Sequence, residues 1–89
     1  MTHSFIDTHC HFDFPPFSGV ETSSIARAAE AGVRAIIVPA IEAARFEKVL
    51  ALAQGHDALY AALGLHPIVI EHHLDDHLDR LDATLQNAD

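Results

Sequence analysis

The feature that most constrains the fold is an alternation of short apolar runs with segments of helical spacing. Val33–Val38 (VRAIIV) is almost continuously apolar and rich in β-branched residues, as expected for a strand covered on both faces of a parallel sheet. Ala58–Leu63 (ALYAAL) predicts another buried strand, and Ser4–Thr8 (SFIDT) a shorter one before both. Strands that alternate with helices along the chain indicate an α/β fold with a parallel sheet.

Three segments between and after these strands are predicted to be helices: Glu21–Ala31, Glu42–Gln54 and His72–Asn87. Gly32 and Gly55 follow the first two, at the position where glycine commonly ends a helix. Successive strands begin about 25 to 30 residues apart, which is the size of one βα unit. The apolar residues at helical spacing are Ile25, Ala28 and Ala29 in the first helix, Phe46, Val49, Leu50 and Ala53 in the second, and Ile70, Leu74, Leu78, Leu81 and Leu85 along the third.

The length of the chain limits what this alternation can build. The 89 residues are enough for one small domain, but three parallel strands alone have two exposed edges and little core. A complete barrel of eight βα units needs about 250 residues. We therefore expect residues 1–89 to form a single partial domain, a parallel (βα)3 segment that corresponds to the start of a TIM-type (βα)8 barrel.

Composition excludes several classes of protein. Hydrophobic residues make up 49% of the chain and charged residues 20%, which is globular composition. No apolar run reaches the roughly 18 residues of a membrane span, and the first residues lack a signal peptide's pattern. We therefore expect a cytoplasmic protein with no membrane partner. The formal charge of −8 argues against a basic nucleic-acid footprint, but a bound cation would invert the local field.

The stretch Ile6–Asp13 (IDTHCHFD) concentrates ionisable side chains at the end of the first predicted strand. Strand alternation places Asp7, His9 and His11 on one face and turns Cys10 to the other. Parallel α/β proteins carry their active sites at the carboxyl ends of the strands. We predict that His9 and His11 bind a divalent cation, with Asp7 suited to orient the imidazoles. The alternative is that both histidines are surface or hydrogen-bonded core residues; Cys10 is predicted to be a packed thiol.

Three stretches in this order, FIDTHCHFDF, GVRAIIVPA and YAALGLHP, resemble the start of the TatD family of metal-dependent hydrolases. The resemblance implies a (βα)8 barrel with one or two divalent cations at its mouth, which the sequence does not identify as Mg, Mn or Zn. It implies phosphodiester hydrolysis, typically by a deoxyribonuclease that trims DNA from a 3′ end, with DNA as the partner. It carries the metal role to His9 and His11, and it places His66, in the GLHP turn, toward the substrate or a group that supports the ligands.

The resemblance also implies what residues 1–89 do not contain. The later ligands of the family are a glutamate after the fourth strand, two further histidines and an aspartate near the last strand, and none has a place here. No catalytic residue is therefore predicted within this chain, and we expect the 89-residue chain alone to be inactive.

Two other functions fit the same sequence. An amidohydrolase-type enzyme that cleaves C–N or ester bonds begins with the same His-x-His pattern. A glutamate in a Gly-Glu-x-Gly-Leu-Asp-like segment after residue 89 would favour the nuclease, and a metal-bridging lysine the amidohydrolase. A non-enzymatic remnant or assembly module is the second alternative, since exposed strand edges are predicted to make the isolated chain self-associate.

Four further side chains are weaker candidates. His73 and His77 have the i, i+4 spacing that can hold a metal, but the aspartates around them favour a solvated helix face. Glu42 follows the second strand and could support the site, although helix capping is the simpler role. Asp13 could hydrogen-bond a ligand or cap the loop, and the sequence does not separate these roles.

Overall fold

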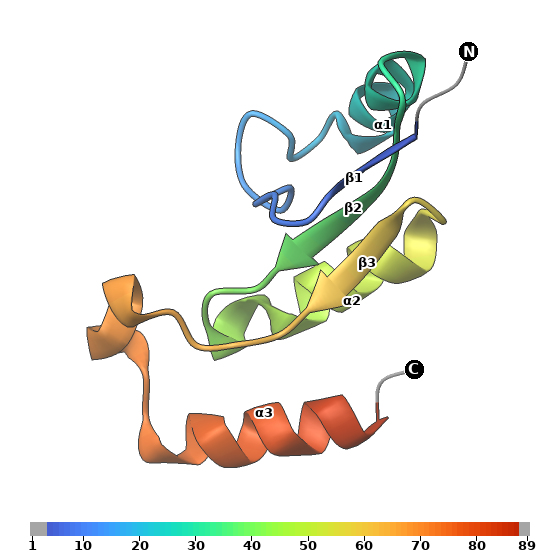
Figure 1. The fold of residues 1–89 in the computed structure, drawn as a ribbon. Coiled ribbons are helices and arrows are strands. Elements are labelled where there is room, and N and C mark those ends of the chain that lie inside the picture. The colour runs from blue at the N-terminus through green and yellow to red at the C-terminus, as the bar shows by residue number, and fades with distance from the viewer. Residues whose placement is uncertain (1–3, 88–89) are drawn as a thin grey trace.

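The computed structural model describes residues 4–87 of the chain and shows a strand followed by a helix three times (Figure 1). Short 3₁₀ helices, η1 and η2, precede α2 and α3. The elements are β1 (Phe5–Asp7), α1 (Glu21–Glu30), β2 (Val33–Pro39), η1 (Ala43–Arg45), α2 (Phe46–Gly55), β3 (Leu59–Ala62), η2 (Pro67–His72) and α3 (Asp75–Asn87).

The three strands form one sheet in the order β1-β2-β3, and both pairings are parallel. In the register, Asp7 lies opposite Ile36, and Ile36 lies opposite Leu59. The strands run in one direction, so the loops that leave β1, β2 and β3 gather at one end of the sheet (Figure 1). This arrangement is the parallel βα repeat that the alternation of apolar runs predicts.

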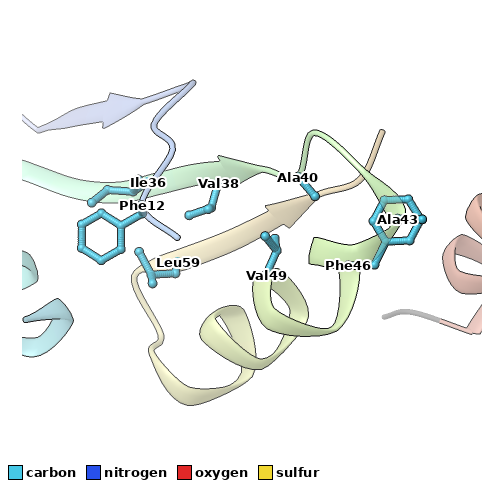
Figure 2. Close-up of a cluster of buried hydrophobic side chains, with 8 residues drawn as sticks. All are labelled: Phe12, Ile36, Val38, Ala40, Ala43, Phe46, Val49 and Leu59. Carbon is cyan, nitrogen blue, oxygen red and sulfur yellow. The ribbon is translucent and has the colours of Figure 1, made fainter. Parts of the chain in front are cut away.

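The core lies between the sheet and α2 and includes the loop after β1. In Figure 2, Phe12 stands at one end of the cluster, and Ala43 and Phe46 stand at the other. Phe46 and Val49 are both buried, on the face of α2 that helical spacing predicts. The buried apolar residues are Phe12, Ile36, Val38, Ala40, Ala43, Phe46, Val49 and Leu59.

The strands differ from the prediction by one residue at their ends: β1 and β3 are shorter at both ends, and β2 is longer at one. β1 ends at Asp7, so the histidine pair lies in a loop and not in the strand. β2 extends through Pro39, which pairs with Ala62. Proline ends a strand by lacking an N–H, but here the next amide, that of Ala40, donates to the Ala62 carbonyl at 2.7 Å and continues the contact.

The helix boundaries show how local signals compete. Gly32 has a φ of 95° and follows α1 in the left-handed conformation predicted for a glycine stop. Gly55 does not follow α2 as predicted but is its last residue, and His56 after it is extended. The helix predicted over His72–Asn87 begins at Asp75, because His73 is extended and separates it from η2.

The apolar stripe of the third helix is only partly covered in the described part of the chain. Leu81 packs against the core, whereas Leu74, Leu78 and Leu85 are exposed. A groove of about 690 Å³ runs beside α3 and is also lined by residues of α2 and β3. No helix within residues 4–87 is both long and apolar enough to cross a membrane.

Candidate metal centre at the carboxyl end of the sheet

The loop after β1 is anchored so that the two histidines of the motif lie together. The Cys10 N–H donates to the Ile37 carbonyl at 3.0 Å, which extends the contact with β2 beyond the strand. Phe12 enters the core and is only 2% exposed. The imidazoles of His9 and His11 meet edge to face, with ring centroids 4.9 Å apart and an interplanar angle of 85°. The structure therefore brings together the pair that strand alternation predicts, although the strand itself ends earlier.

Asp7 and Cys10 have distinct surroundings in this loop. The Asp7 Oδ1 accepts a hydrogen bond from the backbone N–H of His9 at 3.1 Å, so this carboxylate holds the backbone of the turn. Burial raises the pKa of the Cys10 thiol, and the carboxylates of Asp7 and Asp13 raise it further. A thiol in these surroundings stays protonated at neutral pH, which agrees with the prediction of a packed thiol.

The histidine pair fits a divalent cation as two ligands of a larger set. Neutral imidazole nitrogens suit Zn²⁺ and other transition-metal ions. The Nδ1 atom of His11 is buried and has no hydrogen-bond partner among residues 4–87, which leaves it free for a further group. Within the same residues, no three side chains of histidine, cysteine, aspartate or glutamate gather closely enough to hold a metal ion. The remaining ligands would have to come from elsewhere.

His66 shares with His11 a pocket of about 330 Å³, which is lined by His11, Phe14, Ile41, His66 and Ile68. The backbone N–H of His66 donates to the Ile41 carbonyl at 2.7 Å. Its Nδ1 accepts a hydrogen bond from the Ile68 N–H at 3.0 Å. In the neutral ring this bond leaves the proton on Nε2, so His66 has one remaining donor, the Nε2–H group.

The connections after β2 and β3 are bound to each other. The His72 Nδ1 lies 3.2 Å from a carboxylate oxygen of Glu42, which joins the two connections. Within the connection after β3, the His73 Nε2 bonds the carbonyl of His66 at 2.8 Å. Glu42 therefore contacts η2. The Nδ1 of His77 accepts from the Leu74 N–H at the start of α3. His73 and His77 thus have local structural bonds. Both are half-buried, and His73 is extended before α3, so the two histidines do not form a solvated face of one helix as the sequence predicts.

Arg45 and Asp13 form a contact that the sequence analysis missed. The Arg45 Nη1 donates to the Asp13 carbonyl at 3.1 Å and to its carboxylate at 3.4 Å. The guanidinium carbon lies 3.7 Å from the centroid of the Phe14 ring. Asp13 is 1% exposed. An aspartate between two phenylalanines was a signal of a buried carboxylate, but no sequence pattern pointed to a partner 32 residues away.

A parallel α/β sheet with paired imidazoles above its carboxyl end defines the class of α/β proteins that build an active site from strand-end loops. A family profile described as TatD related DNase matches residues 6–89. The chain belongs to this family.

Several curated proteins are similar to this chain in sequence. The chain is 62% identical over 82 residues to an uncharacterized metal-dependent hydrolase of Escherichia coli, YjjV. This match covers 92% of this chain and 32% of that protein. A putative deoxyribonuclease of Danio rerio, tatdn3, is 33% identical over 69 residues, covering 76% of this chain and 26% of the relative. An uncharacterized metal-dependent hydrolase of Haemophilus influenzae is 36% identical over 88 residues, covering 96% and 34%.

The crystal structure of YjjV, a TatD homologue, superposes on the chain with a TM-score of 0.90 at 62% identity, over 92% of this chain and 32% of that one. This likeness confirms the predicted fold class, a parallel (βα)3 segment of a TIM-type hydrolase barrel. The chain spans about a quarter to a third of the length of these relatives.

Proposed function

We propose that residues 1–89 form the first three βα units of a metal-dependent phosphodiester hydrolase that trims DNA from its 3′ end. The observation that carries this proposal is the edge-to-face pair of His9 and His11, beside a pocket that also contains His66. Membership in the TatD-related DNase family supports hydrolysis, and the names of the relatives support metal dependence and DNA as a substrate.

His9 and His11 would supply two nitrogen ligands to a divalent cation at the mouth of the barrel. When bound, such an ion polarises a phosphoryl oxygen and lowers the pKa of water. The Nε2–H of His66 would donate a hydrogen bond to a phosphate oxygen, with its direction fixed by the Ile68 N–H. Phe14 and Ile41 give the pocket apolar walls, which would provide contact area for a sugar or base.

The charge of the chain is relevant to this substrate. A formal charge of −8 repels DNA, and a cation at the histidine pair would reverse the sign of the field where the phosphate binds. We further propose that the other ligands, and the aspartate that activates the attacking water, lie outside residues 1–89. Two imidazoles alone leave most of a cation's coordination positions to water, so the isolated chain would lack activity.

The test uses the complete barrel, by which we mean a protein in which residues 1–89 are followed by the remaining βα units. A double variant, His9→Ala with His11→Ala, is expected to lose bound metal and to lose activity on labelled single-stranded DNA. The loss should exceed the roughly 10- to 100-fold that changes in supporting residues cause. His56→Ala, which changes a histidine between α2 and β3, is the matched control.

Unchanged metal content and rate in the double variant would contradict the metal site. Activity on amide or ester substrates without cleavage of DNA would contradict the phosphodiesterase and favour the amidohydrolase-type alternative.

A further inference from the structure

We propose that Arg45 is a positioning residue for the histidine pair: it fixes the Asp13–Phe14 segment and, through Phe14, the imidazole of His11. The relevance to metal binding rests on the function proposed above, whereas the effect on the geometry of His11 does not.

The guanidinium of Arg45 makes three contacts with two consecutive residues, Asp13 and Phe14, of the loop after β1, here called the histidine loop. Its Nη1 donates to both the carbonyl and the carboxylate of Asp13, and its carbon lies over the ring of Phe14. The Asp13 side chain has no exposed area, and that of Arg45 is 29% exposed. The other carboxylate oxygen of Asp13, Oδ1, has no hydrogen-bond partner within residues 4–87. Arg45 is therefore the counter-charge that the structure gives this buried carboxylate.

Phe14 transmits this restraint to His11. The Phe14 N–H donates to the His11 carbonyl at 3.2 Å. The two rings meet edge to face, with centroids 6.2 Å apart and an interplanar angle of 81°. Both side chains line the pocket that contains His66. One ring of Phe14 thus contacts both the guanidinium and the imidazole. A shift of this ring would remove one of the two aromatic neighbours of His11, the other being His9.

Arginine suits this position better than lysine does. A planar guanidinium can stack on an aromatic ring while its N–H groups bond a carboxylate and a carbonyl, whereas an ammonium is a point charge. Arg45 also belongs to η1, directly before α2 in the core layer. The loop after β1 is therefore anchored to the helix layer through Arg45 as well as to the sheet through Cys10.

The experiment separates positioning from general stability in the complete barrel. Arg45→Met combined with Asp13→Asn removes the guanidinium without leaving a buried unpaired carboxylate. Arg45→Lys keeps the charge and loses the stacking. Arg34→Met is the matched control, because Arg34 lies on β2 and bonds the Ser4 hydroxyl. Thermal unfolding, Zn²⁺ and Mn²⁺ affinity by calorimetry, and the imidazole NMR signals of the metal-free protein are measured for each.

We expect both Arg45 variants to fold, to bind metal about 10- to 100-fold more weakly, and to show broadened or shifted His11 signals before any metal is added. Arg34→Met should leave all three measurements unchanged. The inference is overturned if the Arg45→Met, Asp13→Asn protein keeps its metal affinity within about twofold and shows parental His11 signals. If His9→Ala leaves metal affinity unchanged, the proposed metal site fails, and the metal-free His11 signals still decide the role of Arg45.

Discussion

The 89-residue chain, when separated from the other units of a barrel, is expected to self-associate or to unfold in part. The sheet has β1 and β3 as its edge strands, and no strand within residues 4–87 pairs with their outer edges. An unprotected edge of a parallel sheet is a template for pairing with another chain. The Cα radius of gyration of 14.1 Å exceeds the roughly 12 Å expected for a compact domain of this length.

The exposed apolar side chains set the magnitude of the effect. Nine large apolar residues are between 49% and 77% exposed, on β1, β3, η2, α3 and the surrounding loops. Full burial of such a side chain stabilises by about 1.5–3 kcal/mol, so half to three-quarters exposure forgoes about 1–2 kcal/mol each. The sum is on the order of 10–15 kcal/mol, as large as the whole net stability of about 5–15 kcal/mol of an ordinary domain.

Sedimentation velocity and amide hydrogen exchange over a hundredfold range of concentration test this expectation. The mass or the exchange protection should depend on concentration. Ile6→Lys places a charge on the β1 edge and is expected to reduce association, while Ala26→Lys makes the same charge change on the exposed surface of α1 as a control. A monomer at every concentration, with strongly protected amides in all three strands, would refute the reasoning and show a self-sufficient domain.

Two further predictions concern the chemistry of the histidine loop. We expect the isolated chain to show no cleavage above background when it is incubated with labelled single-stranded DNA and Mg²⁺ or Mn²⁺. Metal-dependent cleavage that disappears in His9→Ala would contradict the proposal that ligands lie outside residues 1–89. Alkylation of Cys10 should be slow at pH 7 and reach its half-maximal rate at a pH above the ordinary thiol value of about 8.5, because burial and then the carboxylates of Asp7 and Asp13 raise its pKa. Asp7→Asn should move that midpoint to lower pH, and a midpoint at or below the ordinary value in the parent chain would contradict the assigned surroundings.

The elements that the sequence predicts well are those specified by local pattern. The apolar run Val33–Val38 and the stripe with Phe46 and Val49 identify β2 and the buried face of α2, because burial repeats at the period of each element. The pairing of His9 with His11 also follows from alternation. The two imidazoles lie together although β1 ends at Asp7 before them. The reason is that the Cys10 bond to Ile37 and the burial of Phe12 keep Cys10 and Phe12 on the side opposite the histidines.

The features that the sequence does not predict depend on contacts between distant residues. Leu74 and Ile70 share one apolar stripe by spacing, but His73 is extended between them and bonds the His66 carbonyl, so η2 and α3 are separate helices. Asp13 and Arg45 are 32 residues apart and belong to no motif. Such pairs become visible only once the sheet order places the loop after β1 beside η1.

The bonds between the connections after β2 and β3 limit how this barrel mouth can change in evolution or by design. Barrel enzymes diversify by exchanging their loops on a constant scaffold. Here the two loops share the His66–Ile41 backbone bond and the pairing of Glu42 with His72, so neither is a separate module. If residues 64–74 alone were transplanted, the His66 N–H would lose its acceptor, the Ile41 carbonyl, and His72 would lose the Glu42 carboxylate. Residues 40–45 and residues 64–74 therefore have to be exchanged together, as one unit of two loops.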